Sequence, residues 1–143
     1  MEIEAVLFDL DGTLVDSLPL IRRTYKNVFD EMGILWDEKA IDGMIGLPLK
    51  DIGEHFAESK GTRFVELYHI YYHRDLDLFT RLFPDTQMML SNLQKRQIKL
   101  GIVTSKGRSG TTRTTSFTGI DCFMDVIITA DDSLKHKPDP GPL

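Results

Sequence analysis

The sequence predicts an α/β fold in which a parallel sheet carries a helical insertion after its first strand. A short, mostly apolar run from Ile3 to Phe8 has the character of a strand, and two similar runs follow at 98–104 and 124–129. Apolar residues at helical spacing fill most of the interval up to residue 81. Strands that alternate with helices are typical of parallel sheets, because the crossover connections are right-handed.

The first strand is expected to be buried on both faces, because its residues show no alternation of apolar and polar side chains. Four helical segments should follow at 17–32, 37–44, 49–60 and 62–81, the first capped by Ser17 and closed by Gly33. The last segment is the clearest, because its apolar residues share one helical face; these are Phe64, Leu67, Tyr68 and Tyr71.

The second half of the chain supplies the rest of the sheet. Asp85 can cap a helix over 85–97, and the strands 98–104 and 124–129 enclose a crossover segment, 108–119. This segment contains five threonines, which are poor helix formers, so we expect its helix to be short or frayed. The expected domains are a core of residues 1–15 and 84–143 and a helical cap of residues 16–83.

Composition excludes several classes of function. A net charge of -5 over 143 residues argues against a broad nucleic-acid-binding face. No apolar run approaches the ~18 residues of a membrane span, and the first residues lack the basic region of a signal peptide. We expect a cytoplasmic protein with neither nucleic-acid nor membrane partners. Cys122, which has no second cysteine to pair with, is expected to be a small core residue.

Two carboxylates follow the first strand. Asp9 and Asp11 should point to one side about 6 to 7 Å apart, at the edge where open α/β sheets bind ligands. Gly12 permits a sharp turn whose free amides suit a phosphate. One carboxylate then serves as nucleophile or metal ligand and the other as acid or base. A plain solvated turn is the alternative, whereas a calcium loop is excluded because its positions six and twelve are Leu14 and Leu20.

Two later sites should share this edge. Thr104, followed by Ser105 and Lys106, ends the second strand, and Lys137 lies just beyond the third. A hydroxyl and an ammonium group beside two carboxylates suit a phosphoryl group held near a divalent cation. Each residue alone is more often structural or solvated, so the prediction rests on their combination.

The motifs Asp9-Leu10-Asp11-Gly12-Thr13, Ile102-Val103-Thr104 and Lys137-Pro138-Asp139-Pro140 resemble the haloacid dehalogenase superfamily and its phosphoglycolate phosphatase-like branch. The resemblance implies a phosphatase acting on small phosphorylated metabolites. Asp9 would become an aspartyl-phosphate, and Asp11 would protonate the leaving group and then activate water. Mg²⁺ would lie on the Asp9 carboxylate and the Asp11 carbonyl. The implied substrate-binding residues are Gly12, Thr13, Thr104, Ser105 and Lys137, and the cap would select the substrate.

The same resemblance bears on the reaction. Sugar-phosphate mutases of this branch carry a histidine and an arginine where this chain has Ile21 and Leu49. Hydrolysis is therefore favoured over mutase chemistry. The family's fourth motif, which supplies a further carboxylate to Mg²⁺, does not occur before Leu143, so we expect a truncated chain with weak or absent turnover. Its first strand would become an exposed edge prone to self-association. A non-catalytic binding or oligomerisation fragment is the rival interpretation.

Several other residues are weaker candidates. His69 and His73 have the i, i+4 spacing of a metal pair, but a partly exposed helix face is the simpler reading. The tyrosines of the same helix are expected to pack within the cap rather than stack on a ligand. Solvated roles are expected for Arg22, Arg23 and Lys50, near a Gly46-Leu47-Pro48 loop that resembles the family's specificity loop.

Overall fold

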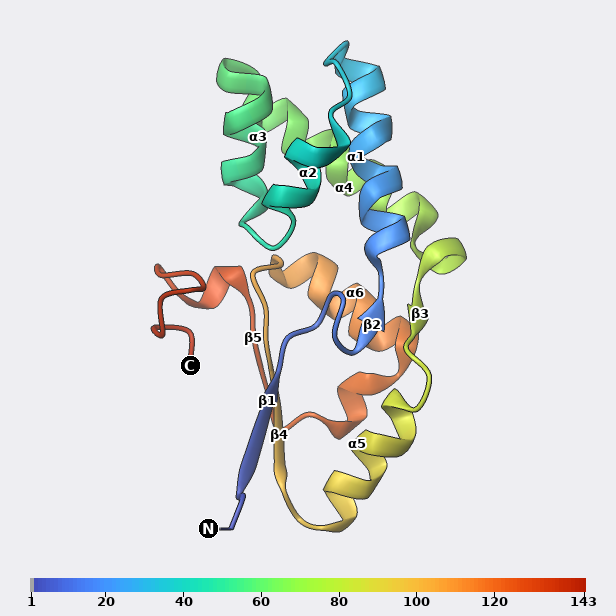
Figure 1. Cartoon of the computed structure of the whole chain (residues 1–143), viewed down its shortest axis with the longest axis vertical. Helices are drawn as coiled ribbons and strands as arrows, with labels where there is room; N and C mark the ends of the chain where they lie inside the picture. The colour runs from blue at the N-terminus through green and yellow to red at the C-terminus, as the bar shows by residue number, and fades with distance from the viewer. Residues whose placement is uncertain (1) are drawn as a thin grey trace.

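The computed structural model describes residues 2–143 as a three-stranded sheet with a layer of helices beyond the carboxyl ends of its strands (Figure 1). The sheet has the order β1-β4-β5, formed by β1 (Ala5–Phe8), β4 (Lys99–Val103) and β5 (Val126–Ile128). Both pairings are parallel, and Ile102 lies opposite both Phe8 and Ile127. The predicted α/β class with a parallel sheet is therefore confirmed.

The first strand is an exposed edge strand, as the resemblance implied for this chain, and is not buried on both faces as the residue pattern predicted. We expected burial on both faces, yet every residue of β1 is exposed or half-buried, and Leu7 is 46% exposed. The reason is topological, because β1 lies at the edge of the sheet formed by residues 2–143. The buried central strand is β4, in which Leu100 to Val103 are all buried.

Two helices connect the strands of the sheet, α5 (Thr86–Lys95) and α6 (Arg108–Thr118). The expectation of a short or frayed crossover helix is wrong, because α6 is regular over 11 residues. The hydroxyl groups of Thr111, Thr115 and Thr118 each donate to the carbonyl four residues earlier, at 2.8 to 3.0 Å. These bonds satisfy the hydroxyls inside the helix, so a threonine-rich face can be buried.

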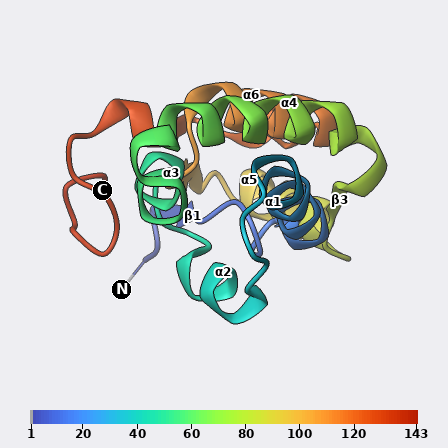
Figure 2. The ribbon, with the colours of Figure 1, turned by 90° about the horizontal axis from the view of Figure 1, so that it is seen from above.

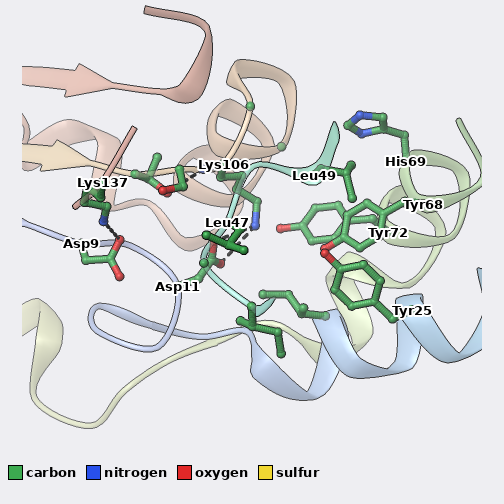
Figure 3. Close-up of a pocket in the computed structure, with 17 residues that line it drawn as sticks. Asp9, Asp11, Tyr25, Leu47, Leu49, Tyr68, His69, Tyr72, Lys106 and Lys137 are labelled. Atoms are coloured by element: carbon green, nitrogen blue, oxygen red, sulfur yellow. Dashed lines mark hydrogen bonds and ion pairs between the residues drawn. The ribbon is translucent and has the colours of Figure 1, made fainter. Parts of the chain in front are cut away.

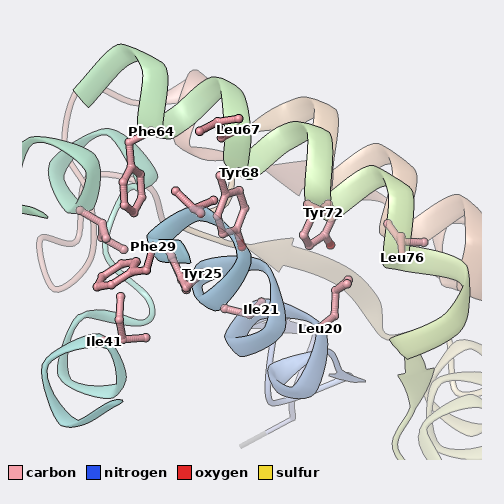
Figure 4. Packing of buried hydrophobic residues seen from close by; sticks show 12 residues of the cluster. Leu20, Ile21, Tyr25, Phe29, Ile41, Phe64, Leu67, Tyr68, Tyr72 and Leu76 are labelled. Carbon is pink, nitrogen blue, oxygen red and sulfur yellow. The ribbon is translucent and has the colours of Figure 1, made fainter. Parts of the chain in front are cut away.

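The helical insertion folds as a layer of its own. It consists of α1 (Leu18–Met32), α2 (Glu38–Met44), α3 (Leu49–Ala57) and α4 (Gly61–Phe79), each within a few residues of the predicted segment. Their apolar faces form one cluster around Phe29 (Figure 4). The rings of Trp36, Phe56 and Phe64 lie 5.0 to 6.0 Å from that of Phe29, in tilted or edge-on arrangements that favour aromatic packing.

A second cluster packs beside the sheet and is made of Leu10, Leu14, Val15, Leu90, Leu100, Ile102 and Ile120. Two short antiparallel strands, β2 (Val15–Asp16) and β3 (Arg81–Leu82), carry the chain into and out of the helical layer (Figure 1). Two residues are too few to produce a periodic pattern, so the sequence did not predict these strands. The proposed cap limits, 16 and 83, fall at or beside them.

Helices α4 and α6 lie side by side when the molecule is viewed from above (Figure 2). Their buried contact includes a hydrogen bond of 2.6 Å between the Tyr72 hydroxyl and Thr114 Oγ1. Because α4 belongs to the helical layer and α6 covers the sheet, this bond joins the two parts of the molecule.

The prediction that Cys122 fills the core is wrong. Cys122 is exposed rather than core-filling, because it lies in a short 3₁₀ turn where its Sγ contacts the Gly119 carbonyl at 3.0 Å.

Among the helices of residues 2–143, none combines the length and apolarity needed to cross a membrane.

Candidate active site

The two aspartates leave the carboxyl end of β1 and reach one cavity. Strand β1 ends at Phe8, so Asp9 and Asp11 follow it directly. Both side chains line a cavity of about 200 Å³ between the sheet edge and the helical layer (Figure 3). The i, i+2 spacing thus brings both carboxylates to the same space, as the sequence predicted.

Lys137 is the partner of Asp9. Its Nζ lies 2.8 Å from Asp9 Oδ1 and 3.2 Å from the Val103 carbonyl at the end of β4. The residue comes from the loop after β5, so three neighbouring strand ends converge here. Both charged side chains remain partly open to solvent, with exposed fractions of 36% for Lys137 and 45% for Asp9.

Asp11 has a different set of partners and is more deeply buried. The Lys106 ammonium lies 2.9 and 3.1 Å from its two carboxylate oxygens, and the Ser17 hydroxyl donates to Oδ1. The same ammonium lies 4.5 Å from the centre of the Tyr72 ring, a favourable cation–π contact. Burial lowers the pKa of Lys106, but Asp11 and Tyr72 together outweigh burial and raise the pKa of the ammonium above its ordinary value.

Thr104 and Ser105 follow β4 and also line the cavity. Thr104 is buried, and its Oγ1 accepts a hydrogen bond of 3.1 Å from the Lys106 amide, which holds the loop in place. Ser105 Oγ is buried but has no hydrogen-bond partner among residues 2–143. A buried hydroxyl without a partner is unfavourable, because it has lost its hydrogen bonds to water.

The structure does not bring Gly12 and Thr13 to the cavity. Their amides, which we expected to face a phosphate, donate instead to Val15 and Leu10 carbonyls at 2.9 and 3.2 Å. Gly12 has a φ of +78°, so it serves the turn itself, which leads the chain into β2. Both residues are exposed, and neither lines the cavity.

The helical layer closes the cavity with mostly apolar groups. Its contribution to the lining consists of Ile21, Tyr25, Ile45, Gly46, Leu47, Leu49, Tyr68, His69 and Tyr72. Burial, followed by the charge of Lys106, lowers the pKa of His69, so its imidazole is neutral at pH 7. Burial raises the pKa of Tyr25 and Tyr68, so both phenols remain protonated.

Other candidates lie away from the cavity or act structurally. Arg22, Arg23 and Lys50 pair with Asp42, Asp75 and Glu54 respectively, and none of the three lines the cavity. The rings of His69 and His73 stack at 6.1 Å, and among residues 2–143 no three His, Cys, Asp or Glu side chains form a metal cluster.

Sequence reasoning named Lys106 only as a neighbour of Thr104 and assigned it no role. The signal available was its position in the loop that leaves the carboxyl end of the strand, where ligand-binding residues of α/β sheets are found. Its burial and its contact with Tyr72 follow from tertiary packing, because α4 covers this loop.

The oxygen atoms at the carboxyl end of β1 provide part of the ligand set that a hard cation such as Mg²⁺ requires. The Asp9 carboxylate is accessible, and within the described chain no hydrogen bond uses the Asp11 backbone carbonyl. Magnesium commonly binds one or two carboxylates and completes its octahedron with water and substrate oxygens. The residues present therefore fit an incomplete magnesium site.

Comparisons with known proteins agree with this geometry. The family model for haloacid dehalogenase-like hydrolases matches residues 6–143. The pyrophosphatase PpaX of Oceanobacillus iheyensis is 36% identical over 143 residues, covering 100% of this chain and 67% of the relative. The chain thus spans about two thirds of the length of the curated relatives it matches.

Two solved structures share the arrangement of elements. A "putative phosphoglycolate phosphatase" from Lactobacillus plantarum has a TM-score of 0.85 at 27% identity, covering 99% of this chain and 69% of that one. A "putative beta-phosphoglucomutase" from Thermotoga maritima has a TM-score of 0.70 at 25% identity, with coverage of 96% and 66%. From the family match and these structures together, the chain belongs to the haloacid dehalogenase-like hydrolase family.

Proposed function

We propose that this chain carries the phosphoryl-transfer site of a phosphatase for small phosphorylated metabolites. The observation that carries the proposal is one cavity lined by two aspartates, two lysines and the hydroxyl residues Thr104 and Ser105. A phosphoryl group needs a nucleophile, a proton donor and positive charge around its oxygens, and this cavity offers all three. Pyrophosphatase relatives at 36% identity support the same reaction class.

The residues suggest a reaction in two displacements. An Asp9 oxygen attacks phosphorus, the bond to the leaving oxygen breaks, and Asp11, which must be in its protonated form at this step, supplies the proton to that oxygen. Asp11 is then a carboxylate and removes a proton from water, whose oxygen attacks the phosphorus of the aspartyl-phosphate. The Asp9–phosphorus bond breaks, which releases phosphate and regenerates the Asp9 carboxylate.

Positive charge and hydroxyl groups hold the transferred phosphoryl group in this proposal. Lys137 contacts Asp9 directly, so its ammonium lies where the phosphoryl oxygens arrive. Thr104 and Ser105 present hydroxyls at the end of β4. Mg²⁺ would be held by the Asp9 carboxylate and the Asp11 carbonyl, where it supplies charge neutralisation for the phosphoryl oxygens.

We further propose that turnover by this chain is slow. Two protein groups, the Asp9 carboxylate and the Asp11 carbonyl, are proposed to hold the cation, and among residues 2–143 no three His, Cys, Asp or Glu side chains form a metal cluster. A cation held by few protein ligands dissociates readily, so activity should rise steeply with Mg²⁺ concentration.

Mutase chemistry is the second candidate, because a protein described as a mutase shares the fold. Ile21 and Leu49, which stand where such enzymes are expected to carry histidine and arginine, both line the cavity. Neither side chain can exchange a proton or bind a second phosphate, and hydrolysis is therefore favoured.

The test is hydrolysis of p-nitrophenyl phosphate and of pyrophosphate with and without millimolar Mg²⁺. The Asp9→Asn variant should lose activity by roughly a thousandfold, since the nucleophile is gone. Asp30→Asn, an exposed change of the same chemistry on α1, is the control and should leave the rate unchanged.

Trapping the intermediate gives a second measurement that does not need fast turnover. Acid quenching followed by mass spectrometry should find one added phosphoryl group on the peptide that contains Asp9. Magnesium-dependent hydrolysis and this adduct together support the phosphatase. No hydrolysis and no adduct in the unaltered chain would overturn it and favour a non-catalytic binding module.

A further inference from the structure

Each carboxylate in the cavity has an ammonium partner of its own. Lys137 accompanies Asp9, the proposed nucleophile, whereas Lys106 accompanies Asp11, the proposed proton donor (Figure 3). A proton donor must lie beside the oxygen that links phosphorus to the leaving group. Because Lys106 contacts Asp11, its ammonium lies on the leaving-group side of the site in the proposed reaction.

Lys106 is largely buried and lies at the cavity. Its side chain is 12% exposed, and its ammonium rests between the Asp11 carboxylate and the ring of Tyr72. An ammonium has three N–H donors, and in the structure they are directed at Asp11 and Tyr72. Since Lys106 also lines the cavity, an anionic oxygen bound there can take over one donor by replacing one of these contacts.

No other cation serves the leaving-group side. Among the described residues, the helical layer contributes no lysine or arginine to the lining, and the lowered pKa of His69 makes its imidazole neutral at pH 7. The remaining groups there are aliphatic side chains and phenols. A leaving group with a negative charge would thus find one matching partner, next to the reacting oxygen.

We propose that Lys106 is a specificity-determining residue that binds an anionic oxygen of the leaving group, as in the second phosphoryl group of a pyrophosphate. The inference rests on the proposed phosphatase function and names its substrate class. Asp11 protonates the linking oxygen while Lys106 contacts the non-bridging oxygens beside it. A neutral alcohol as leaving group leaves that donor unused, so short phosphoanhydrides are preferred over esters of neutral alcohols.

The test is calorimetric binding, which does not depend on turnover. Imidodiphosphate, an analogue of pyrophosphate with nitrogen at the bridge, is compared with inorganic phosphate in millimolar Mg²⁺. The unaltered chain should bind imidodiphosphate at least roughly tenfold more tightly. In Lys106→Met this preference should disappear while phosphate binding changes less than about threefold, and Lys106→Arg should retain most of it.

Controls separate this role from others. Lys99→Met removes an exposed charge at the opposite end of β4 and should leave both affinities unchanged. Lys137→Met should weaken both ligands, because this ammonium lies at the shared phosphoryl position.

Two outcomes overturn the inference alone. In the first, the unaltered chain would bind phosphate but show no preference for imidodiphosphate. In the second, Lys106→Met would weaken the binding of both ligands equally, which would make Lys106 a positioning residue for Asp11. Failure of the unaltered chain to bind either ligand would instead overturn the phosphoryl site itself, and the inference with it.

Discussion

At the scale of single residues, buried charge in this protein is paired. Asp75 on α4 has a side chain only 7% exposed and lies between two arginines. Arg74 donates to both of its oxygens at 2.7 Å, and Arg23 on α1 donates at 3.1 Å. The hydrogen bonds from Arg74, and then those from Arg23, hold the pKa of Asp75 below its ordinary value. The group therefore ties α1 to α4.

We predict that Asp75→Asn lowers the free energy of unfolding by about 2 kcal/mol at pH 7, because charge-assisted hydrogen bonds are lost. A depressed pKa in the folded state means that the stabilisation exists above the unfolded pKa, near 4, and disappears as pH falls through the folded value. The difference between the two proteins should accordingly shrink below about pH 4.

Urea denaturation of both proteins at several pH values between about 3 and 7 measures this difference in the free energy of unfolding. Asp42→Asn is the comparison, because Asp42 pairs with Arg22 across an exposed contact. Its cost should stay below about 1 kcal/mol. A difference for Asp75→Asn that stays constant down to the acid end would contradict the assigned cause.

At the scale of elements, α6 shows how a poor helix-forming sequence becomes a regular helix. Thr114 is fully buried and bonds to the Tyr72 hydroxyl, which is itself buried on α4. Threonine serves this interface because it is compact and carries a hydroxyl group. Packing against α4 outweighs the weak intrinsic propensity of the segment.

We predict that Thr114→Val destabilises the protein by about 1 to 2 kcal/mol, because it leaves the Tyr72 hydroxyl buried without that partner. Thr112→Val makes the same change at an exposed position of α6 and should alter stability by less than about 0.5 kcal/mol. Thermal unfolding of both variants checks the difference.

A double-mutant cycle with Tyr72→Phe isolates the bond. Once the phenol hydroxyl is absent, Thr114→Val should cost clearly less than it does alone. Equal costs in both backgrounds would show that the hydrogen bond contributes nothing to the contact between α4 and α6.

At the scale of the whole molecule, two apolar clusters and the open sheet edge at β1 determine the behaviour of the chain. The helical layer packs around Phe29, whereas the sheet packs around Leu100 and Ile102. The edge strand β1 carries Leu7, 46% exposed, and Ile3 just before the strand is 61% exposed. Edge strands with apolar side chains pair readily with other chains.

We predict reversible self-association through β1. Sedimentation should show oligomers that increase with protein concentration, and Leu7→Lys should reduce them, since a charge on an edge strand opposes pairing. Leu78→Lys, at an exposed leucine on α4, is the matched control and should leave association unchanged. Equal loss of association in both variants, or a monomer at all concentrations, would contradict the role of this edge.

Much of the architecture could be predicted because its causes are local in the sequence. Helical periodicity located α1 to α4 within a few residues, and three apolar runs located the strands. The spacing of Asp9 and Asp11 placed both carboxylates at one edge. The exposure of Cys122, by contrast, depends on which neighbours the fold supplies, and periodicity contains no information about neighbours.

The sequence by itself determined the α/β class and the set of charged and hydroxyl groups at the carboxyl edge of the sheet, because strand ends of parallel strands meet there. Only the tertiary structure decided that Gly12 and Thr13 serve the turn, that Ser105 Oγ is buried with no partner among residues 2–143, and that Lys106 is buried between Asp11 and Tyr72. These outcomes arise where residues far apart in the chain pack together, and long-range packing leaves no periodic trace in sequence.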